Sequence, residues 1–303
     1  MHNKTGSSVL LRLPFACTRT VLVGVFAITS LVALGAEPEL VRGQFREVDT
    51  LFANPGQGWM SQQRTPHQLR ALARASGQAY MDRLSDQSNI VHLAGSRGFH
   101  DNIEWSVPLA SDPDFASILV NTVKAPTRNR HFMSTGSGIE TIKASGNEIT
   151  LATTDLMNAD VVDGIRTMID SMPLPPPPVN FPGDKMASDS PLRVLLVSSE
   201  QYTAILRSNS NQFRTFQSNA MARAQVAGMN PLFMGEAGIW NGVLIVKMPK
   251  PIRFYSGNAL NWCASLTSET ETTTDLVPAA FGTTYAVDRA ILLGGQALAE
   301  AWG

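Results

Sequence analysis

The longest regular alternation of apolar and polar positions covers residues 65–94, and it predicts one amphipathic helix. Thr65 and Gln68 form a Thr-x-x-Gln capping box at its start, and Gly95 is a stop signal at its end. At 1.5 Å per residue this helix would be about 45 Å long, which suits a flat, elongated subunit better than a compact globule. Its predicted apolar stripe consists of Leu69, Leu72, Ala73, Ser76, Tyr80, Leu84 and Val91.

The rest of the chain mixes shorter helical and extended patterns, which predicts an α+β fold. The predicted helices are residues 154–171, 200–209 and 213–228. The predicted strands are residues 44–51, 192–197 and 240–247, and the apolar stretch 286–301 is compatible with a strand or a helix. A loop is predicted for residues 95–132, with a short helix near 114–123, and the Gly/Ser/Thr-rich residues 134–147 are predicted to be exposed.

Four consecutive prolines at positions 175–178 follow the 154–171 helix. Such a run is stiff and extended, so it favours a connector between two lobes over a ligand for a proline-binding domain.

The apolar stretch 20–34 has two interpretations. Basic residues precede it and the small residues 33–36 follow it, as in a secretory signal peptide that is cleaved near Ala36. Its interruption by Gly24, Thr29 and Ser30, together with the alternation of Val9, Leu11 and Leu13 with their neighbours, instead favours a β-rich segment over residues 7–35 that is buried against the fold or against a neighbouring chain. The stretch is short for a membrane span.

Composition narrows the classes of function. The chain has 303 residues, of which 44% are hydrophobic and 16% charged, so it can bury a sizeable core as one large or two small domains. A net charge of −1 argues against a nucleic-acid binder that acts through a basic surface. Cys17 and Cys263 are the only cysteines, which excludes a disulfide framework and a zinc site but leaves one bridge between them open.

Motifs for catalysis are missing from the sequence. The five histidines show no paired metal-ligand spacing, and there is no phosphate-binding loop or nucleophile elbow. Ser137 lies between two glycines, which is typical of a flexible loop. Scattered acidic residues neither select nor exclude a glycosidase pair. We therefore predict no catalytic residue, no cofactor and no metal ligand, with a secreted enzyme or carbohydrate-active protein as the alternative, supported by the signal-like start and the Asn54-Pro-Gly-Gln-Gly-Trp59 turn.

Three stretches carry a resemblance to a known family. They begin Met60-Ser-Gln-Gln-Arg-Thr-Pro-His-Gln-Leu-Arg, Asn230-Pro-Leu-Phe-Met-Gly-Glu-Ala-Gly-Ile-Trp-Asn-Gly and Arg289-Ala-Ile-Leu-Leu-Gly-Gly-Gln-Ala, and the last ends Ala301-Trp-Gly303. In this order and spacing the chain resembles tailed-phage major capsid proteins of the Hong Kong 97 fold, of the podophage and prophage type, over residues 58–303.

The resemblance implies a division of the chain. Residues 1–59 would be the N-terminal arm and extended loop, and residues 60–180 the peripheral domain with its spine helix (65–94). Residues 181–280 would be the axial domain, and residues 281–303 a C-terminal return segment.

It also implies a function and partners. The chain would self-assemble, as hexamers and pentamers, into an icosahedral shell that encloses a double-stranded DNA genome. It would be assembled in the host cytoplasm and found in the virion, beside portal, scaffold or decoration proteins and away from membranes. The candidate inter-subunit contacts are Trp59, Arg64, Arg70, Arg74 and Trp240.

Overall fold

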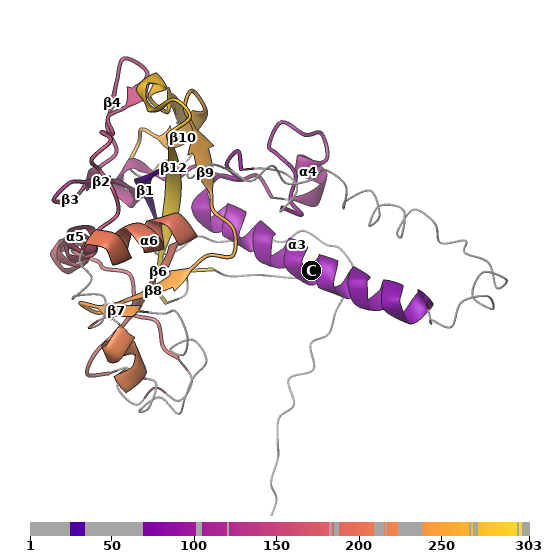
Figure 1. Ribbon diagram of the computed structural model, residues 1–303, viewed down its shortest axis with the longest axis horizontal. Helices are drawn as coiled ribbons and strands as arrows, with labels where there is room; N and C mark the ends of the chain where they lie inside the picture. Colours follow the sequence, from indigo (N-terminus) through magenta and orange to yellow (C-terminus); the bar gives the residue numbers. More distant parts are fainter. Residues whose placement is uncertain are drawn as a thin grey trace, which may run out of the picture.

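The structure is a computed structural model that describes residues 25–33, 69–100, 105–119, 121–181, 184, 188–208, 215, 217–223, 238–266, 268, 272–295 and 297–298. For residues 25–33 and 69–73 it describes the backbone alone. Within these ranges the chain is a mixed helix-and-sheet protein, in which a long helix extends away from two packed sheets (Figure 1). The predicted strand at residues 44–51 lies outside the described residues.

The larger sheet has eight described strands in the order β3-β2-β1-β12-β6-β8-β7, with β9 also paired to β12. Their bounds are β1 Val25–Ala33, β2 His131–Thr135, β3 Gly138–Thr141, β6 Arg193–Val197, β7 Gly238–Trp240, β8 Val243–Lys247, β9 Arg253–Tyr255 and β12 Tyr285–Leu293. The apolar stretch 286–301 is a strand as far as Leu293. β12 pairs with three other strands because β6 and β9 follow one another along the edge that β1 does not occupy.

β1 lies in the middle of this sheet. It is antiparallel to β12 along its whole length and parallel to β2 at Ala27–Thr29. Residues 25–33 therefore form a strand paired on both sides. The β-rich interpretation of the 20–34 stretch is confirmed for these residues.

The smaller sheet has four described strands in the order β10-β11-β5-β4. Their bounds are β4 Ala144–Ser145, β5 Glu148–Ile149, β10 Ala259–Cys263 and β11 Thr272–Leu276, and the short helices nearby are α4 Phe115–Ile118, η1 Arg128–Arg130 and η3 Ala279–Phe281. The prediction that residues 134–147 are exposed is wrong in part, because Ser134 and Ile142 are buried. β3 and β4 lie in this stretch, and they are too short for a pattern of alternation to reveal them.

The predicted helices agree with the structure except in two places: α4 ends at Ile118, earlier than the short helix predicted near 114–123, and α5 begins later than predicted. α3 spans Leu69–Ala94, α5 spans Ala159–Ser171 and α6 spans Ser199–Ser208, and residues 217–223 are helical. Residues 65–68, with the predicted cap, lie outside the described residues. α5 begins five residues after the predicted position 154, because the side chain of Asn158 accepts a hydrogen bond from the Val161 amide and caps the helix there.

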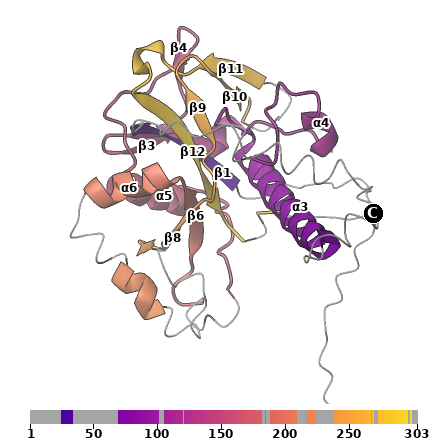
Figure 2. The ribbon, with the colours of Figure 1, turned by 45° about the vertical axis from the view of Figure 1, so that its right-hand side comes forward.

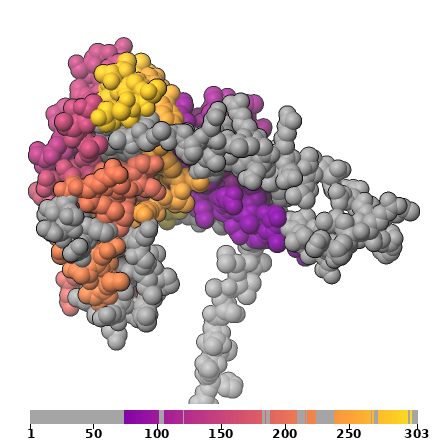
Figure 3. Space-filling model, in the orientation of Figure 1, coloured from indigo at the N-terminus to yellow at the C-terminus, as the bar shows by residue number. Residues whose placement is uncertain are grey.

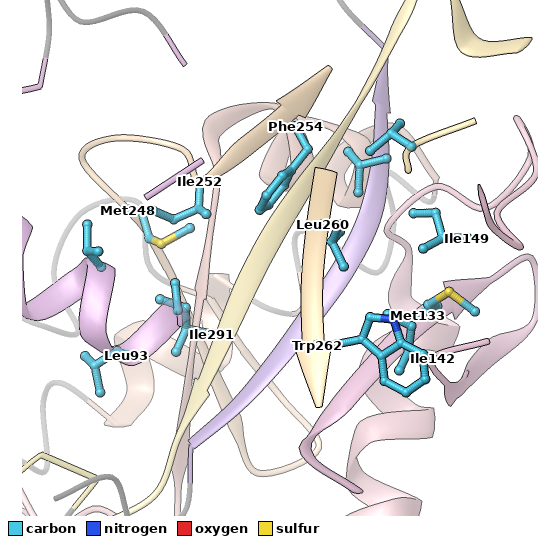
Figure 4. Close-up of a cluster of buried hydrophobic side chains, with 14 of the residues drawn as sticks. Leu93, Met133, Ile142, Ile149, Met248, Ile252, Phe254, Leu260, Trp262 and Ile291 are labelled. Atoms are coloured by element: carbon cyan, nitrogen blue, oxygen red, sulfur yellow. The ribbon is translucent and has the colours of Figure 1, made fainter. Parts of the chain in front are cut away.

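Neighbouring residues of β12 face two different cores. Val287 and Ile291 lie in a core shared with the end of α3, β9 and β10, whereas Ala290 and Leu292 lie in a core shared with α5 and α6. Figure 2 shows α5 and α6 together on one side of the larger sheet, with α3 on the other. Figure 4 shows part of the first core, with Leu93 of α3 near Ile291 and with Trp262 of β10 beside Ile142.

The proline run is packed against the end of β12. The Gly295 amide donates to the Pro177 carbonyl at 2.7 Å, and the Arg193 guanidinium donates to the Pro176 carbonyl at 2.8 and 3.1 Å. A Cβ atom on Gly294 would lie 2.7 Å from the Cβ of Pro176. The run is therefore fixed to the larger sheet and is not a free spacer.

Residues 238–247 form a hairpin rather than the single predicted strand. Asn241 and Gly242 have φ angles of +46° and +74°, and they turn β7 back onto β8. Asn-Gly between two apolar runs favours such a turn, because both residues tolerate positive φ.

Candidate functional site

The end of α3 is fixed in the core, whereas residues 74–86, the exposed half of α3, are largely exposed. Val91, Leu93 and Ala94 are buried, and the chain leaves the helix at Gly95 with a φ of +65°. From residue 74 to residue 86 the side chains are exposed except for the partly buried Gly77, Tyr80 and Leu84. The predicted apolar stripe is confirmed at Val91, which is buried, and at Tyr80 and Leu84, which are partly buried. Ser76, which is also part of the predicted stripe, is exposed. Figure 3 shows the surface of α3 extending beyond the sheets.

The sequence-predicted contact residues do not all lie on one surface. Arg74 is exposed on α3, and Arg70 lies on the same helix with its side chain undescribed. Trp59 and Arg64 lie outside the described residues. Trp240, at the end of β7, is partly buried, and its indole N–H donates to the Asp163 carboxylate of α5 at 2.8 Å. Trp240 therefore joins the β7–β8 hairpin to α5.

Two fully buried charges lie side by side in β12 and face opposite sides of the sheet. Asp288 accepts two hydrogen bonds from Arg253, at 2.8 and 2.9 Å, on the side of α6. Glu200 of α6 binds the same guanidinium at 2.9 Å. Burial alone would lower the pKa of Arg253, but the bonds to Asp288 and Glu200 outweigh it and raise the pKa.

Arg289 faces α3 instead and has no carboxylate partner among the described residues. Its guanidinium donates to the Ala94 carbonyl at 2.8 Å and to the Asn261 carbonyl at 3.4 Å, and it lies 5.2 Å from the centre of the Phe254 ring. Burial lowers the pKa of Arg289 to about 9. Burial, and then the Arg289 charge, lower the pKa of the fully buried His131 well below its usual value.

Sequence reasoning missed these charged residues. The available signal was a charged pair, Asp288-Arg289, inside an otherwise apolar run. Buried strands rarely carry such pairs unless the charges have partners.

A cavity of about 660 Å³ lies between the start of α5 and α6. Its lining includes one carboxylate, Glu200, and one guanidinium, Arg207, beside Leu156, Met157 and small polar side chains. Glycoside hydrolysis usually needs two carboxylates, and Glu200 is already bound to Arg253. Among the residues that the structure describes, the cavity therefore offers one carboxylate, which already pairs with an arginine.

The other candidates for chemistry also have structural roles. Cys263 is buried and its thiol donates to the Ala125 carbonyl at 3.3 Å, and Cys17 lies outside the described residues. Ser137 is exposed in the turn between β2 and β3, as predicted. Among the described residues no three acidic, histidine or cysteine side chains are grouped so as to hold a metal ion. None of the described helices combines the length and apolar character that crossing a membrane requires.

Comparison with known proteins identifies the family. The sequence model of a family described as phage capsid protein matches residues 52–303. The chain belongs to the phage capsid protein family. Its members form the shells of phage particles, so the capsid protein is a virion component that assembles with copies of itself.

One solved structure is also similar to the capsid protein. It is the capsid of Ralstonia phage GP4, with 15% sequence identity and a TM-score of 0.49, covering 89% of this chain and 79% of the other. No curated protein has a sequence that matches. The alternative of a secreted enzyme has no support from these findings.

Proposed function

We propose that the capsid protein is the subunit of an icosahedral shell of the Hong Kong 97 type, and that α3 is its spine helix. The observation that carries the proposal is the geometry of α3, a 26-residue helix with one end in the core and the other half exposed beyond the sheets. In this proposal residues 60–180, which include α3 and the strands β2 to β5, are the peripheral domain. Residues 181–280 are the axial domain and residues 281–303 the return segment. Residues 1–59 are the N-terminal arm and extended loop, of which β1 is the part that joins the larger sheet.

The exposed half of α3 is a poor candidate for a helix that stands alone. Isolated helices shorter than about 12–15 residues are marginal in water. Gly77 lies inside this half, and an interior glycine weakens a helix by about 0.8–1 kcal/mol relative to alanine. Contact with a neighbouring subunit would stabilise the half that the subunit's own core does not reach.

Arg74 and Met81 define the side of α3 that we assign to this contact. They are seven positions, or about two turns, apart, so they lie on the same side of the helix. Arg74 is exposed, and the Met81 side chain is 49% exposed, which is unusual for a large apolar residue. An apolar anchor beside an arginine is a common composition at protein interfaces. Shell formation would bury roughly 2,000 Å² or more per subunit, as obligate assemblies do.

The proposal includes the enclosed genome and the partners of assembly. A net charge of −1 would keep the subunits from binding strongly to packaged double-stranded DNA along their whole inner face. Portal, scaffold and decoration proteins are the expected partners besides the subunit itself.

The assignment of α3 can be tested with two paired substitutions. Arg74→Glu combined with Met81→Asp changes the exposed side of α3 without touching the core, so the subunit should fold and remain unassembled. Arg128→Glu reverses the charge of an exposed arginine away from α3 and is the control. Sedimentation velocity of the purified proteins separates shells from free subunits. If the double variant forms shells as well as the control does, α3 is not the contact.

A further inference from the structure

Among the buried charged residues that the structure describes, Arg289 is the one whose charge is least compensated by its surroundings. It is completely buried, and its Nε atom has no hydrogen-bond partner. Arg253, on the opposite side of the same sheet, has Asp288 and Glu200 as partners. A buried charge without a counter-charge destabilises a fold, and an apolar side chain of similar size is often more favourable in its place. Folding of the subunit alone therefore does not explain an arginine at this position.

The contacts of Arg289 show what the charge does. Its Nη1 atom donates to Ala94, the last residue of α3, and its Nη2 atom donates to Asn261 of β10. The backbone of Arg289 itself belongs to β12, so one side chain joins the long helix, the larger sheet and the smaller sheet. The carbonyl end of a helix carries partial negative charge, which favours a cation there.

Close packing fixes the chain beyond this point. A Cβ atom on Gly95 would lie 2.6 Å from the Lys124 carbonyl oxygen, and one on Gly98 would lie 2.8 Å from the backbone of Arg253. These contacts fix the segment after the helix. The bond from Arg289 is a polar contact with the last turn of α3 itself, beside the core packing of Val91, Leu93 and Ala94.

A small change in the direction of α3 at Ala94 would move the opposite end of the helix by a large distance. The 26 residues of α3 span about 39 Å, so a tilt of about 10° at Ala94 would move the far end by about 7 Å. That distance exceeds the tolerance of a packed interface, in which atoms must meet at about 4 Å.

We propose that Arg289 is a positioning residue for assembly: it holds the last turn of α3 against the two sheets and so sets the direction in which the exposed half of α3 meets the neighbouring subunit. The predicted effect of Arg289 on the shell rests on the proposed function. The anchoring of α3 is a property of the free subunit and can be measured separately.

Arg289→Met tests the proposal, because methionine keeps an unbranched stem and removes the charge and its donors. In the free subunit, the thermal unfolding midpoint should be unchanged or higher than in the wild type. Hydrogen exchange in the last turn of α3 should become about tenfold faster or more, as expected when a charged hydrogen bond is lost. Negative-stain images should show shells that are irregular in diameter or incomplete.

Arg193→Met is the matched control. Arg193 is also a buried arginine that donates to a backbone carbonyl, that of Pro176, and among the described residues it has no hydrogen bond or ion pair with α3. This variant should leave exchange in α3 and the shell diameter as in the wild type.

Three results would overturn the proposal. The first is a folded Arg289→Met subunit with wild-type exchange in α3, and the second is wild-type shells from that variant. The third is failure of both Arg289→Met and Arg289→Lys to fold, because Arg289 would then serve stability and not position. If the wild-type chain formed no shells, the proposed function would fail, and the exchange measurement would still decide whether Arg289 anchors α3.

Discussion

Removal of the Asp288 carboxylate is the sharpest test of the structure on the side of β12 that faces α6. Asp288 is fully buried and is the bidentate acceptor for Arg253, at 2.8 and 2.9 Å. Asp288→Ala leaves this guanidinium, 3% exposed, with Glu200 as its carboxylate partner among the described residues. Breaking a buried pair on one side costs about 3–5 kcal/mol, and we expect the lower end, about 3 kcal/mol, because Glu200 remains.

The assay is urea unfolding of the free subunit, followed by tryptophan fluorescence. A loss of about 3 kcal/mol is a large part of the 5–15 kcal/mol typical of domains, so the midpoint should shift clearly. Asp170→Ala is the control, because the Arg166–Asp170 pair has the same distance of 2.9 Å but an Asp170 side chain that is 57% exposed. Exposed pairs contribute about 0–1 kcal/mol. Equal losses in the two variants, or a loss below about 1 kcal/mol for Asp288→Ala, would refute the reasoning.

Two further predictions concern the free subunit. Gly98→Ala should lose about 1–3 kcal/mol in urea unfolding, because its Cβ would meet the Arg253 backbone at 2.8 Å, and it should lose more than Gly257→Ala, which has a similar φ of +77° and open space. The lowered pKa of His131 means that the folded state stays neutral while the unfolded chain binds a proton as the pH falls below about 6.5, so stability should decline there by up to about 1.4 kcal/mol per pH unit. His131→Gln should flatten this decline between pH 6.5 and 5, and an unchanged slope would contradict the burial of His131.

Local signals were enough to predict the helices and some strands. The stop at Gly95 is encoded by one residue that tolerates positive φ, and α6 follows from its own periodicity. The predicted start of α5 is too early, because the sequence reasoning takes no account of Asn158, whose side chain caps the helix five residues further on. The hairpin at Asn241-Gly242 was missed although its turn signal is local.

Features that depend on pairing between distant segments could not be predicted. A strand buried on both faces, such as β12, has no alternation, so its apolar run is ambiguous until its neighbours are known. The place of β1 between β2 and β12 depends on partners more than 100 positions along the chain. The same holds for the contact between Arg289 and Ala94, since no sequence pattern marks which carbonyl a buried arginine will reach.

Electron cryo-microscopy of the purified wild-type chain under assembly conditions tests the central claim most directly. The account predicts closed, hollow shells in which the exposed half of α3 packs against the neighbouring subunit. Subunits that remain monomeric under conditions in which related shells assemble, or shells in which the Arg74 and Met81 side of α3 faces solvent, would contradict it.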